Sequence, residues 1–439
     1  MTSSPHDIAV AFLTMGCAKN EVDSANMRVR LLQAGYAIAE DLENANAVVV
    51  NTCSFIQAAT EESIDAILEV AALDTVSSGQ AKLIVAGCMP ARYGADLEEE
   101  LSEASQFVPC ADESSIVSIM DELFDVERLP GDTIALSAGP APTGEISAYV
   151  KISDGCDRFC SYCTIPYIRG RYHSFPYEDI SKEVSGLVGE GVREIVLIAQ
   201  DTGRWGADLE PRASLSNLLE RLAEEHADTW FRVMYIQPEG ITDELIETVA
   251  THENICSYFD IPLQHCNEQI LRAMNRKGNG AEYLSLLERI RSRIPDVTLR
   301  TTLIAGFPGE DDEAFDELCS FVEEAPLDYI GVFAYSREEG TRAYNLPDQV
   351  DEEERQYRAQ RLRDLADDVC TPRIARRIGQ KLDVIVLGCE EDGQLFGRAM
   401  CQAPDVDGVT YVNAGEPGQI MRVTIEDTLM YEMEGTCLS

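Results

Sequence analysis

The chain has 439 residues, of which 45% are apolar, enough for about three domains with their own cores, and this composition excludes a fibrous or disordered protein. Its 78 acidic residues outnumber 35 basic ones and give a formal charge of −43, which disfavours a protein that grips nucleic acid through many phosphate contacts. The N-terminal run MTSSPHDIAVAF lacks the features of a signal peptide, and no later run approaches membrane-spanning length, so we expect a cytoplasmic protein without a membrane anchor.

Residues 1–136 are predicted to form an open α/β domain. The apolar runs IAVAFLTM, AVVVN and KLIVAG alternate with helical patterns, as in a parallel sheet with crossover helices. Cys17, Cys53 and Cys88 each follow one of these strands directly, and the carboxyl ends of parallel strands meet at one edge, so we expect the three thiols to converge. Three thiolates can hold a four-iron cluster and leave one iron open. Unrelated buried thiols or a zinc site are the alternatives.

The rest of the chain is predicted to contain a linker and two further domains. Residues 137–147, SAGPAPTGEIS, have the composition of a linker. Six strand-helix repeats follow in residues 148–350; six are too few for the closed eight-stranded barrel and predict a partial (β/α)6 barrel with active residues on its carboxyl-end loops. Residues 351–375 are predicted to form a charged linking helix, and residues 376–439 a small all-β barrel of about five strands.

A second group of cysteines lies just after the first predicted strand of the partial barrel. The run SDGCDRFCSYC places Cys156, Cys160 and Cys163 in a C-x3-C-x2-C knot. Three thiolates again leave the fourth iron of a cube free for a small molecule. In zinc ribbons, by contrast, two C-x2-C pairs supply all four ligands of the metal. A zinc site that takes its fourth ligand from a distant part of the chain is the alternative.

The knot has the spacing of radical S-adenosylmethionine enzymes, and the order of cysteine-bearing α/β domain, knot and β-barrel resembles the methylthiotransferases across essentially the whole chain. In that resemblance GCAKNEVDS, NTCSFIQAATEESID and GCMPARY supply Cys17, Cys53 and Cys88 as ligands of an auxiliary cluster, and the terminal barrel is a TRAM module. The resemblance implies two 4Fe-4S clusters, S-adenosylmethionine and an external electron donor. It also implies that a deoxyadenosyl radical removes a hydrogen atom, that sulfur is delivered at the auxiliary cluster, and that a second S-adenosylmethionine supplies the methyl group.

Two branches of that family differ in substrate: one modifies an adenosine of transfer RNA, the other an aspartate of ribosomal protein uS12. The stretches LIAQDTGRWG, DIPLQHCNEQILRAMNR, LRTTLIAGFPGE, YSREEGTRAYNLPDQV and GRAMCQAPDVDGVTYV resemble the protein-modifying branch. From Arg376 onward the chain holds 5 basic and 11 acidic residues, a net charge of −6, which suits a basic protein partner better than a phosphate backbone. We therefore expect uS12 as partner and nucleic-acid contact only in the ribosomal context. A lineage-wide acidic composition would explain the charge equally well.

The resemblance indicates one residue that binds S-adenosylmethionine, and the expected barrel edge supplies further candidates. Tyr162 matches an aromatic position near the adenine. The remaining candidates are polar residues expected on the carboxyl edge of the barrel and two glycines that let backbone approach the adenine: Gln200, Asp201, Gln264, Arg300, Gly306 and Gly309. Turn and rim positions are the alternative roles. Arg169 and Arg171 are expected to touch carboxylates of substrate or cofactor, or to pair with the acidic N-terminal domain.

Three further interpretations follow from the pattern. His265 and Cys266 are expected to be structural, and the remaining cysteines, Cys110 among them, to be small buried thiols. A transfer-RNA methylthiotransferase of the same architecture is the nearest alternative function. A two-cluster electron carrier is the alternative from another class, although it would have little use for the partial barrel and the added β-module.

Overall fold

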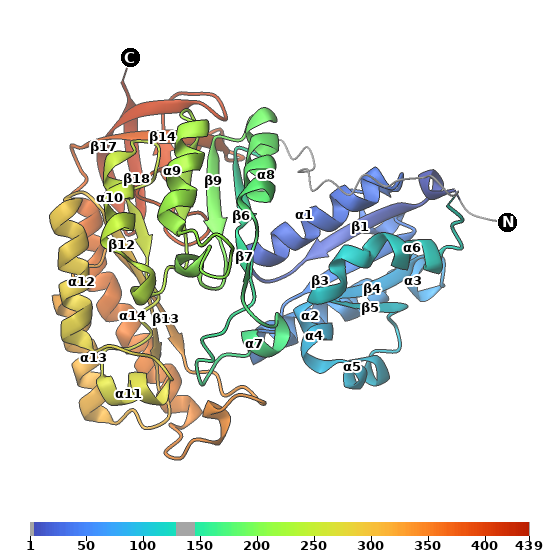
Figure 1. The fold of residues 1–439 in the computed structure, drawn as a ribbon, viewed down its shortest axis with the longest axis horizontal. Helices are drawn as coiled ribbons and strands as arrows, with labels where there is room; N and C mark the ends of the chain where they lie inside the picture. Colours follow the sequence, from blue (N-terminus) through green and yellow to red (C-terminus); the bar gives the residue numbers. More distant parts are fainter. Residues whose placement is uncertain (1–3, 129–144, 439) are drawn as a thin grey trace.

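The structure, a computed structural model that describes residues 4–128 and 145–438, consists of three units that follow one another along the chain (Figure 1). The expected α/β class with a small C-terminal all-β barrel is confirmed. Most of the predicted linker, residues 137–144, lies outside the described residues.

The N-terminal unit is a five-stranded, fully parallel sheet in the order β2-β1-β3-β4-β5. Val48, Val49 and Val50 of the central strand β3 are completely buried, because helices cover both faces of the sheet. The strands are β1 (Ala9–Thr14), β2 (Ala37–Ile38), β3 (Ala47–Thr52), β4 (Lys82–Gly87) and β5 (Gln106–Pro109), and the helices are α1 (Ala18–Gln33), α2 (Gln57–Ala71), α3 (Asp74–Ser77), α4 (Cys88–Tyr93), α5 (Ala95–Glu100) and α6 (Ile116–Leu123).

The central unit contains the six predicted strand-helix repeats. Its strands form two parallel three-stranded sheets, β10-β9-β6 and β11-β12-β13, which an isolated bridge between Phe231 and Ile255 connects. The strands are β6 (Ser147–Lys151), β9 (Glu194–Ile198), β10 (Trp230–Val233), β11 (Tyr258–Asp260), β12 (Thr298–Ala305) and β13 (Tyr329–Ala334), with the short pair β7 (Ser153–Asp154) and β8 (His173–Ser174). The helices are α7 (Ile165–Ile168), α8 (Tyr177–Gly189), α9 (Leu215–Glu225), α10 (Asp243–Thr251), α11 (Glu268–Ala273), α12 (Gly280–Arg293), α13 (Asp312–Glu324) and α14 (Glu352–Ala375).

The outer helices cover one face of these sheets. They pack apolar stripes such as Leu218, Leu219 and Leu222 of α9 against the buried strands and form the largest core of the molecule. The β strands run parallel, so the loops that follow them lie at one end of the partial barrel. The cysteine knot is one of these loops, because it follows β6 and β7 and leads into α7.

The C-terminal unit is a closed barrel in the order β14-β15-β16-β18-β17. Its strands are β14 (Lys381–Cys389), β15 (Leu395–Ala399), β16 (Thr410–Val412), β17 (Ile420–Leu429) and β18 (Glu432–Cys437). Ile385 and Ala403 of this unit pack against Val196, Trp230 and Tyr258 of the partial barrel. The five-stranded barrel therefore covers part of the sheet face that the helices leave open.

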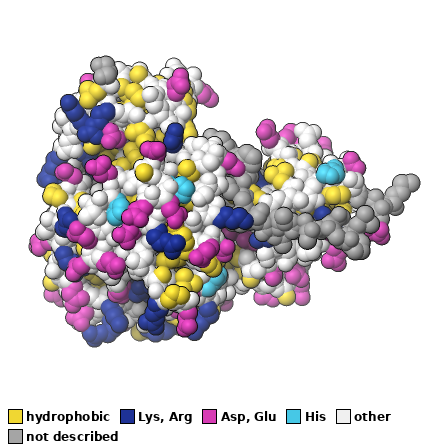
Figure 2. All heavy atoms as spheres, turned by 45° about the horizontal axis from the view of Figure 1, so that its top comes forward, with side chains coloured by type: hydrophobic (Ala, Val, Ile, Leu, Met, Phe, Trp, Pro, Cys, Tyr) yellow, Lys and Arg dark blue, Asp and Glu magenta, His cyan; other side chains and the backbone are white. Residues whose placement is uncertain are grey.

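Charged side chains are spread over both lobes on the face that Figure 2 shows, and Asp and Glu do not gather there into one patch. The strongly negative charge of the molecule is thus distributed on this face, and it does not by itself mark a docking surface there.

In the part of the chain that is described, no helix combines the length and apolarity that crossing a membrane requires.

A buried ion-pair group fastens the C-terminal barrel to the partial barrel. Glu194, at the start of β9, accepts hydrogen bonds from Arg232 at 2.9 Å and from Arg398 of β15. Burial alone would raise the pKa of Glu194, but the guanidinium groups of Arg398 and Arg232 outweigh it and lower that pKa from 4.5 to about 2. The carboxylate is therefore charged at neutral pH and serves as the counter-ion of the two buried guanidinium groups.

Replacing Glu194 with Gln should lower the free energy of unfolding by about 3 kcal/mol, since it leaves two buried guanidinium groups without their counter-ion. Because the folded pKa lies below the unfolded one, wild-type stability from this group is complete above pH 4.5 and is lost as the pH falls from 4.5 toward about 2. Urea unfolding at several pH values measures both effects. The exposed pair of Glu247 and Arg293 provides the control E247Q, which we expect to leave the unfolding midpoint close to that of the wild type. Equal losses in the two variants would contradict this role of Glu194.

Candidate functional site

The three cysteines of the N-terminal unit come together at the carboxyl edge of its sheet. Thr52 of β3 pairs with Gly87 of β4, so Cys53 and Cys88 occupy neighbouring positions just beyond the two strands. The Asn20 side-chain oxygen lies 4.0 Å from the Cys17 sulfur and 3.7 Å from the Cys88 sulfur, and accepts a weak hydrogen bond from each. The strand-end pattern in the sequence thus corresponds to one cluster of thiols.

Two glycines make this approach possible. Gly16 has a φ of +94°, and a Cβ there would lie 2.4 Å from the Cβ of Cys53. Gly87 also has a φ of +94°, and a Cβ there would lie 2.2 Å from the side-chain oxygen of Asn51. Since both the conformation and the space exclude a side chain, the Gly-Cys order in GCAKN and GCMPA is required by the fold.

The environments of these thiols differ. Burial raises the pKa of Cys53 to about 11. A hydrogen bond from Cys110 and the nearby guanidinium of Arg169 lower the pKa of Cys88, although burial opposes them. Cys88 is thus the thiol that the protein itself best prepares as a thiolate, the form that binds metal.

The knot cysteines lie in a loop that the backbone holds in a compact shape. The Cys156 N–H donates to the Gly170 carbonyl at 3.1 Å, and the Cys163 N–H donates to the Cys160 carbonyl at 3.0 Å. Burial raises the pKa of Cys156 and of Cys163. Arg276 donates to the Cys160 sulfur at 3.9 Å and supplies positive charge beside the trio.

Neither cysteine trio has the tight spacing of ligands that share one metal ion. In the described residues 4–128 and 145–438, the only three potential ligands whose donor atoms all lie within 4.8 Å of one another are Glu220, Glu224 and His252 on the outer surface. Neither cysteine trio is that tight. Each sulfur of a trio would bind a different iron of a cube, which needs a wider set than one tetrahedral zinc ion does. In chemical type, three thiols are a donor set that a four-iron cluster accepts with one iron left open.

The two trios lie on loops that touch each other. Thr164, which follows Cys163, donates its hydroxyl to the carbonyl of Phe55, two residues after Cys53, at 3.0 Å. Helix α7, which begins at Ile165, lies beside α4, which begins at Cys88 (Figure 1). The cluster loops of the two units therefore share one side of the molecule.

A second contact comes from the loop after β13. Glu338 pairs with Arg92 of α4 at 2.7 Å, and it also accepts a hydrogen bond from the backbone N–H of Gln57 at 2.7 Å. The side chains of Arg92 and Glu338 are largely buried, and Gln57 is the first residue of α2. The N-terminal unit is thus fastened to the carboxyl-end loops of the partial barrel.

A buried network of four charges lies between the N-terminal unit and the partial barrel. Arg169 contacts Asp23 of α1 at 2.8 Å and Asp154 of β7 at 3.3 Å, and Lys151 bridges the same two carboxylates. Arg169 also donates to Asn20 at 2.8 Å and to the Cys88 sulfur at 3.7 Å. Of the two expectations for Arg169, the ion pair with the acidic N-terminal unit is confirmed, and the same side chain reaches a cluster cysteine.

Replacing Arg169 with Ala should destabilise the folded protein by about 3 kcal/mol, because it leaves Asp23 and Asp154 buried with one cation in place of two. Urea unfolding measures the loss. Arg171 lies two residues away with 75% of its side chain exposed, so R171A is the matched control, and we expect it to change stability by less than about 0.5 kcal/mol. Indistinguishable unfolding curves for the two variants would show that the network does not contribute this stability.

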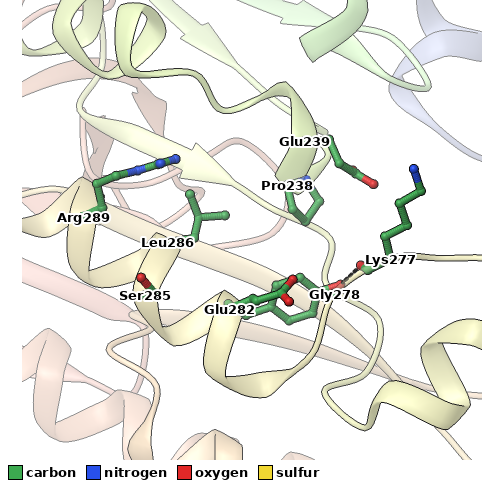
Figure 3. A pocket seen from close by; sticks show the side chains of 9 residues that line it. Pro238, Glu239, Lys277, Gly278, Glu282, Ser285, Leu286 and Arg289 are labelled. Atoms are coloured by element: carbon green, nitrogen blue, oxygen red, sulfur yellow. Dashed lines mark hydrogen bonds between the residues drawn. The ribbon is translucent and has the colours of Figure 1, made fainter.

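A polar cavity of about 400 Å³ opens beside the knot. Arg158, Cys160, Gln237, Asn275 and Arg276 line it, together with Asp157, Glu239 and Lys277. A second pocket, of about 280 Å³, shares two of these residues, and Figure 3 shows them, Glu239 and Lys277, at one of its ends. The knot is therefore reached through a polar opening large enough for a small molecule.

Two predicted cofactor residues carry buried polar atoms without a hydrogen-bond partner among the described residues. They are the Gln200 side-chain oxygen and one carboxylate oxygen of Asp201. The other oxygen of Asp201 pairs with Arg158 at 2.7 Å, and the Gln200 amide donates to Asp154 at 2.9 Å. Buried groups of this kind usually have a partner, so their free atoms fit a polar ligand beside the knot.

The remaining predicted cofactor residues are placed as follows. Tyr162 packs edge-on against Phe307, with ring centroids 6.4 Å apart, and lies against the main core. Gln264 has a φ of +73° and forms a single bridge with Leu303, near the carboxyl end of β12. Gly309 has a φ of +87° with open space where a Cβ would be. Gly306 is required for packing, because a Cβ there would lie 2.4 Å from a side-chain carbon of Arg355 in α14.

Arg300 does not lie on the carboxyl edge where it was expected. It is the third residue of β12 and pairs with Asp260 at 2.9 Å and with Asp407 of the C-terminal unit at 3.5 Å. The side chain joins two units of the protein instead of facing the knot. The run VTLRTTLIAGF shows that a strand is present but does not show where it begins and ends. The sequence therefore could not tell that Arg300 lies near the start of the strand, far from its carboxyl end.

His265 is structural, as expected. Its ring lies within 3.2 Å of a buried carboxylate oxygen of Glu310, and its other nitrogen accepts the backbone N–H of Asn267 at 3.0 Å. Cys266 is fully buried in the main core. Neither residue belongs to the site.

Sequence reasoning missed several residues that hold the site together, among them Asn20, Asp23, Arg276 and Glu338. Asn20 was the easiest to find, because it follows Cys17 by one helical turn in GCAKN. The others act across more than a hundred residues of chain, at Asp23 to Arg169 and at Glu338 to Arg92. No local pattern marks such partners.

Three family descriptions match successive parts of the chain. Residues 9–108 match "Uncharacterized protein family UPF0004", residues 150–322 match the radical SAM superfamily, and residues 378–438 match the TRAM domain. These segments correspond to the N-terminal unit, to most of the partial barrel and to the C-terminal barrel.

Curated relatives match over nearly the whole length. The chain is 42% identical to the ribosomal protein uS12 methylthiotransferase RimO of Geobacter sulfurreducens, with 98% of each chain covered. It is 40% identical to the protein of the same name from Clostridioides difficile, with 98% of this chain and 99% of the relative covered.

Among solved structures, the radical S-adenosylmethionine methyltransferase TsrM from Kitasatospora setae, with cobalamin and a [4Fe-4S] cluster bound, is similar in fold. The TM-score is 0.54 at 12% identity, and 76% of this chain and 74% of that chain are covered. The cobalamin-dependent radical enzyme OxsB, with aqua-cobalamin and S-adenosylmethionine bound, gives a TM-score of 0.51 at 10% identity, with 82% of this chain and 56% of that chain covered. At these identities the likeness concerns the fold alone.

Proposed function

Since the chain belongs to the RimO family of ribosomal protein uS12 methylthiotransferases, we propose how its own residues divide the work of that reaction. It is a radical S-adenosylmethionine enzyme that transfers a methylthio group to uS12, and it uses an iron–sulfur cluster and S-adenosylmethionine. The finer assignments, which are the number of clusters, their ligands, the aspartate target and the electron donor, are our proposal.

We assign two four-iron clusters to the two trios. Cys156, Cys160 and Cys163 hold the cluster that binds S-adenosylmethionine, and the N-terminal trio holds the auxiliary cluster. The observation that carries this assignment is the contact of the two loops, because Thr164 touches Phe55 and Arg169 reaches Cys88. When bound, the cofactors supply a deoxyadenosyl radical, which takes a hydrogen from a carbon that no side-chain base can deprotonate, and the sulfur and methyl group that replace it.

The protein's residues position these groups and exclude water. Gln200 and Asp201 present their free polar atoms to the amino-acid or ribose part of S-adenosylmethionine, and Gln264 borders the same edge. Tyr162, held by Phe307, and the open backbone at Gly309 are proposed to receive the adenine. Arg276 keeps positive charge beside Cys160, which favours the thiolate.

The target is proposed to be the β-carbon of an aspartate of uS12. The net charge of −6 from Arg376 onward supports a basic protein partner at the C-terminal barrel. We propose an external one-electron donor, because reductive cleavage of S-adenosylmethionine consumes one electron. Ribosomal proteins are made and assembled in the cytoplasm, so we propose that the enzyme acts there.

The test is the mass of the product. The anaerobically reconstituted enzyme, with S-adenosylmethionine, dithionite and a sulfide source, should replace one hydrogen of uS12 with a methylthio group, and fragmentation should locate it on an aspartate. In a parallel reaction the same enzyme should leave transfer RNA unchanged. A methylthio group on an adenosine of the transfer RNA, with uS12 unmodified, would overturn the substrate assignment.

A further inference from the structure

A fourth cysteine occupies a strand end next to the N-terminal trio. Cys110 follows β5, and the register pairs Gly87 with Pro109, so Cys110 stands beside Cys88 as Cys88 stands beside Cys53. The strand order β1-β3-β4-β5 therefore sets four thiols in a row along one edge of the sheet. Cys110 is no isolated buried thiol, because its S–H donates to the Cys88 sulfur at 3.9 Å.

Cys110 also faces a cavity, which the trio does not. The cavity has a volume of about 430 Å³ and lies between α1 and the partial barrel, and Cys110 is the one cysteine among its lining residues. The thiol is partly exposed, whereas Cys88 behind it is buried. A small molecule in this cavity would therefore meet Cys110 before it met a cluster ligand.

The walls of the cavity are polar and carry charge of both signs. Arg30, Lys151 and Arg169 line it together with Asp23, Asp154 and Glu183, and His173 adds a ring nitrogen. Lys151 and Arg169 are already paired with Asp23 and Asp154. Glu113 also lines the cavity; the residue is 9% exposed, and its Oε1 has no hydrogen-bond partner within the described residues. A buried polar atom without a partner, aimed into a charged cavity, indicates that a ligand completes the wall.

We infer that Cys110 accepts sulfur from a small persulfide or polysulfide and holds it next to the auxiliary trio. The Cys110 sulfur attacks the outer sulfur of a persulfide R–S–SH, a new S–S bond forms on Cys110, and the bond from that sulfur to R–S breaks. The proton of the Cys110 thiol passes to the departing sulfur, which leaves as R–SH, so the exchange needs no outside oxidant or reductant.

This role rests on the proposed function, since it names a route by which sulfur reaches the auxiliary trio. The competing role is that of a fourth cluster ligand. Four cysteines would close the position that the auxiliary cluster keeps open for sulfur. The two roles make opposite predictions for iron content, so one experiment separates them.

The experiment exposes the anaerobically reconstituted full-length protein to sodium polysulfide labelled with a sulfur isotope, followed by alkylation and mass mapping of each cysteine. Cys110 should carry at least about tenfold more labelled persulfide than Cys389, the exposed cysteine of the C-terminal barrel. C110S should lose this label and keep the full iron content of the wild type. C110A serves as a second variant if C110S does not fold.

Equal labelling of Cys110 and Cys389 would overturn the inference, and so would a loss of iron in C110S, which would identify a ligand. Failure of the inference is distinguishable from failure of the proposed function. In the first case the wild type modifies uS12 while Cys110 stays unlabelled, and in the second Cys110 is labelled while uS12 stays unmodified.

Discussion

Replacing Cys156, Cys160 and Cys163 together with Ala should abolish both deoxyadenosine formation and methylthiolation of uS12, and should lower the iron content from about eight to about four per chain. The reason is that no knot thiol remains to hold the cluster to which S-adenosylmethionine is proposed to bind. Anaerobic reconstitution followed by iron analysis and chromatography of the nucleoside measures both results.

The matched control removes the same number of thiols from the C-terminal barrel, as C389A/C401A/C437A. These cysteines have no contact with either trio among the described residues, so this variant should keep about eight irons and form deoxyadenosine. If the knot variant still cleaved S-adenosylmethionine, the radical chemistry would have to be assigned to another part of the chain.

Replacing Cys17, Cys53 and Cys88 with Ala should separate the two halves of the reaction. Iron should again fall from about eight to about four, but deoxyadenosine should still form, because the knot is intact. uS12 should gain no sulfur. A loss of methylthio product to background, with S-adenosylmethionine cleavage retained, is the expected signature of a sulfur site distinct from the radical site.

Folding must be checked in this variant, because the N-terminal unit touches the barrel through Arg92 and Glu338 and through the Arg169 network. Conservative replacement with Ser keeps the volume of each side chain nearly unchanged and should give the same result. Methylthio product from a soluble variant that lacks all three thiols would remove the N-terminal trio from the reaction.

The parts of the fold that repeat were predictable from sequence. Strand-end positions of Cys17, Cys53 and Cys88 follow from the alternation of apolar runs and helices, and parallel pairing then brings them to one edge. The same alternation gave the six repeats of the partial barrel. Here local pattern and tertiary structure agree, because the strands are buried and their apolar runs are unbroken.

The rest depended on contacts between distant segments. Strand β5 is only four residues long, Gln106–Pro109, and QFVP carries no alternation that identifies it, so Cys110 was taken for an ordinary buried thiol. Arg300 was misplaced for a similar reason, since its partner Asp407 lies in another unit. Which side chains meet across a domain interface is decided by how the units dock, and no periodicity in the chain records it.

Counting iron and acid-labile sulfide in the anaerobically reconstituted wild type, together with its Mössbauer spectrum, tests most directly whether two open trios work side by side. We predict about eight irons per chain in two four-iron clusters, and a fall to about four when either trio is replaced. A wild-type content of about four irons that stays the same after replacement of Cys17, Cys53 and Cys88 would contradict it.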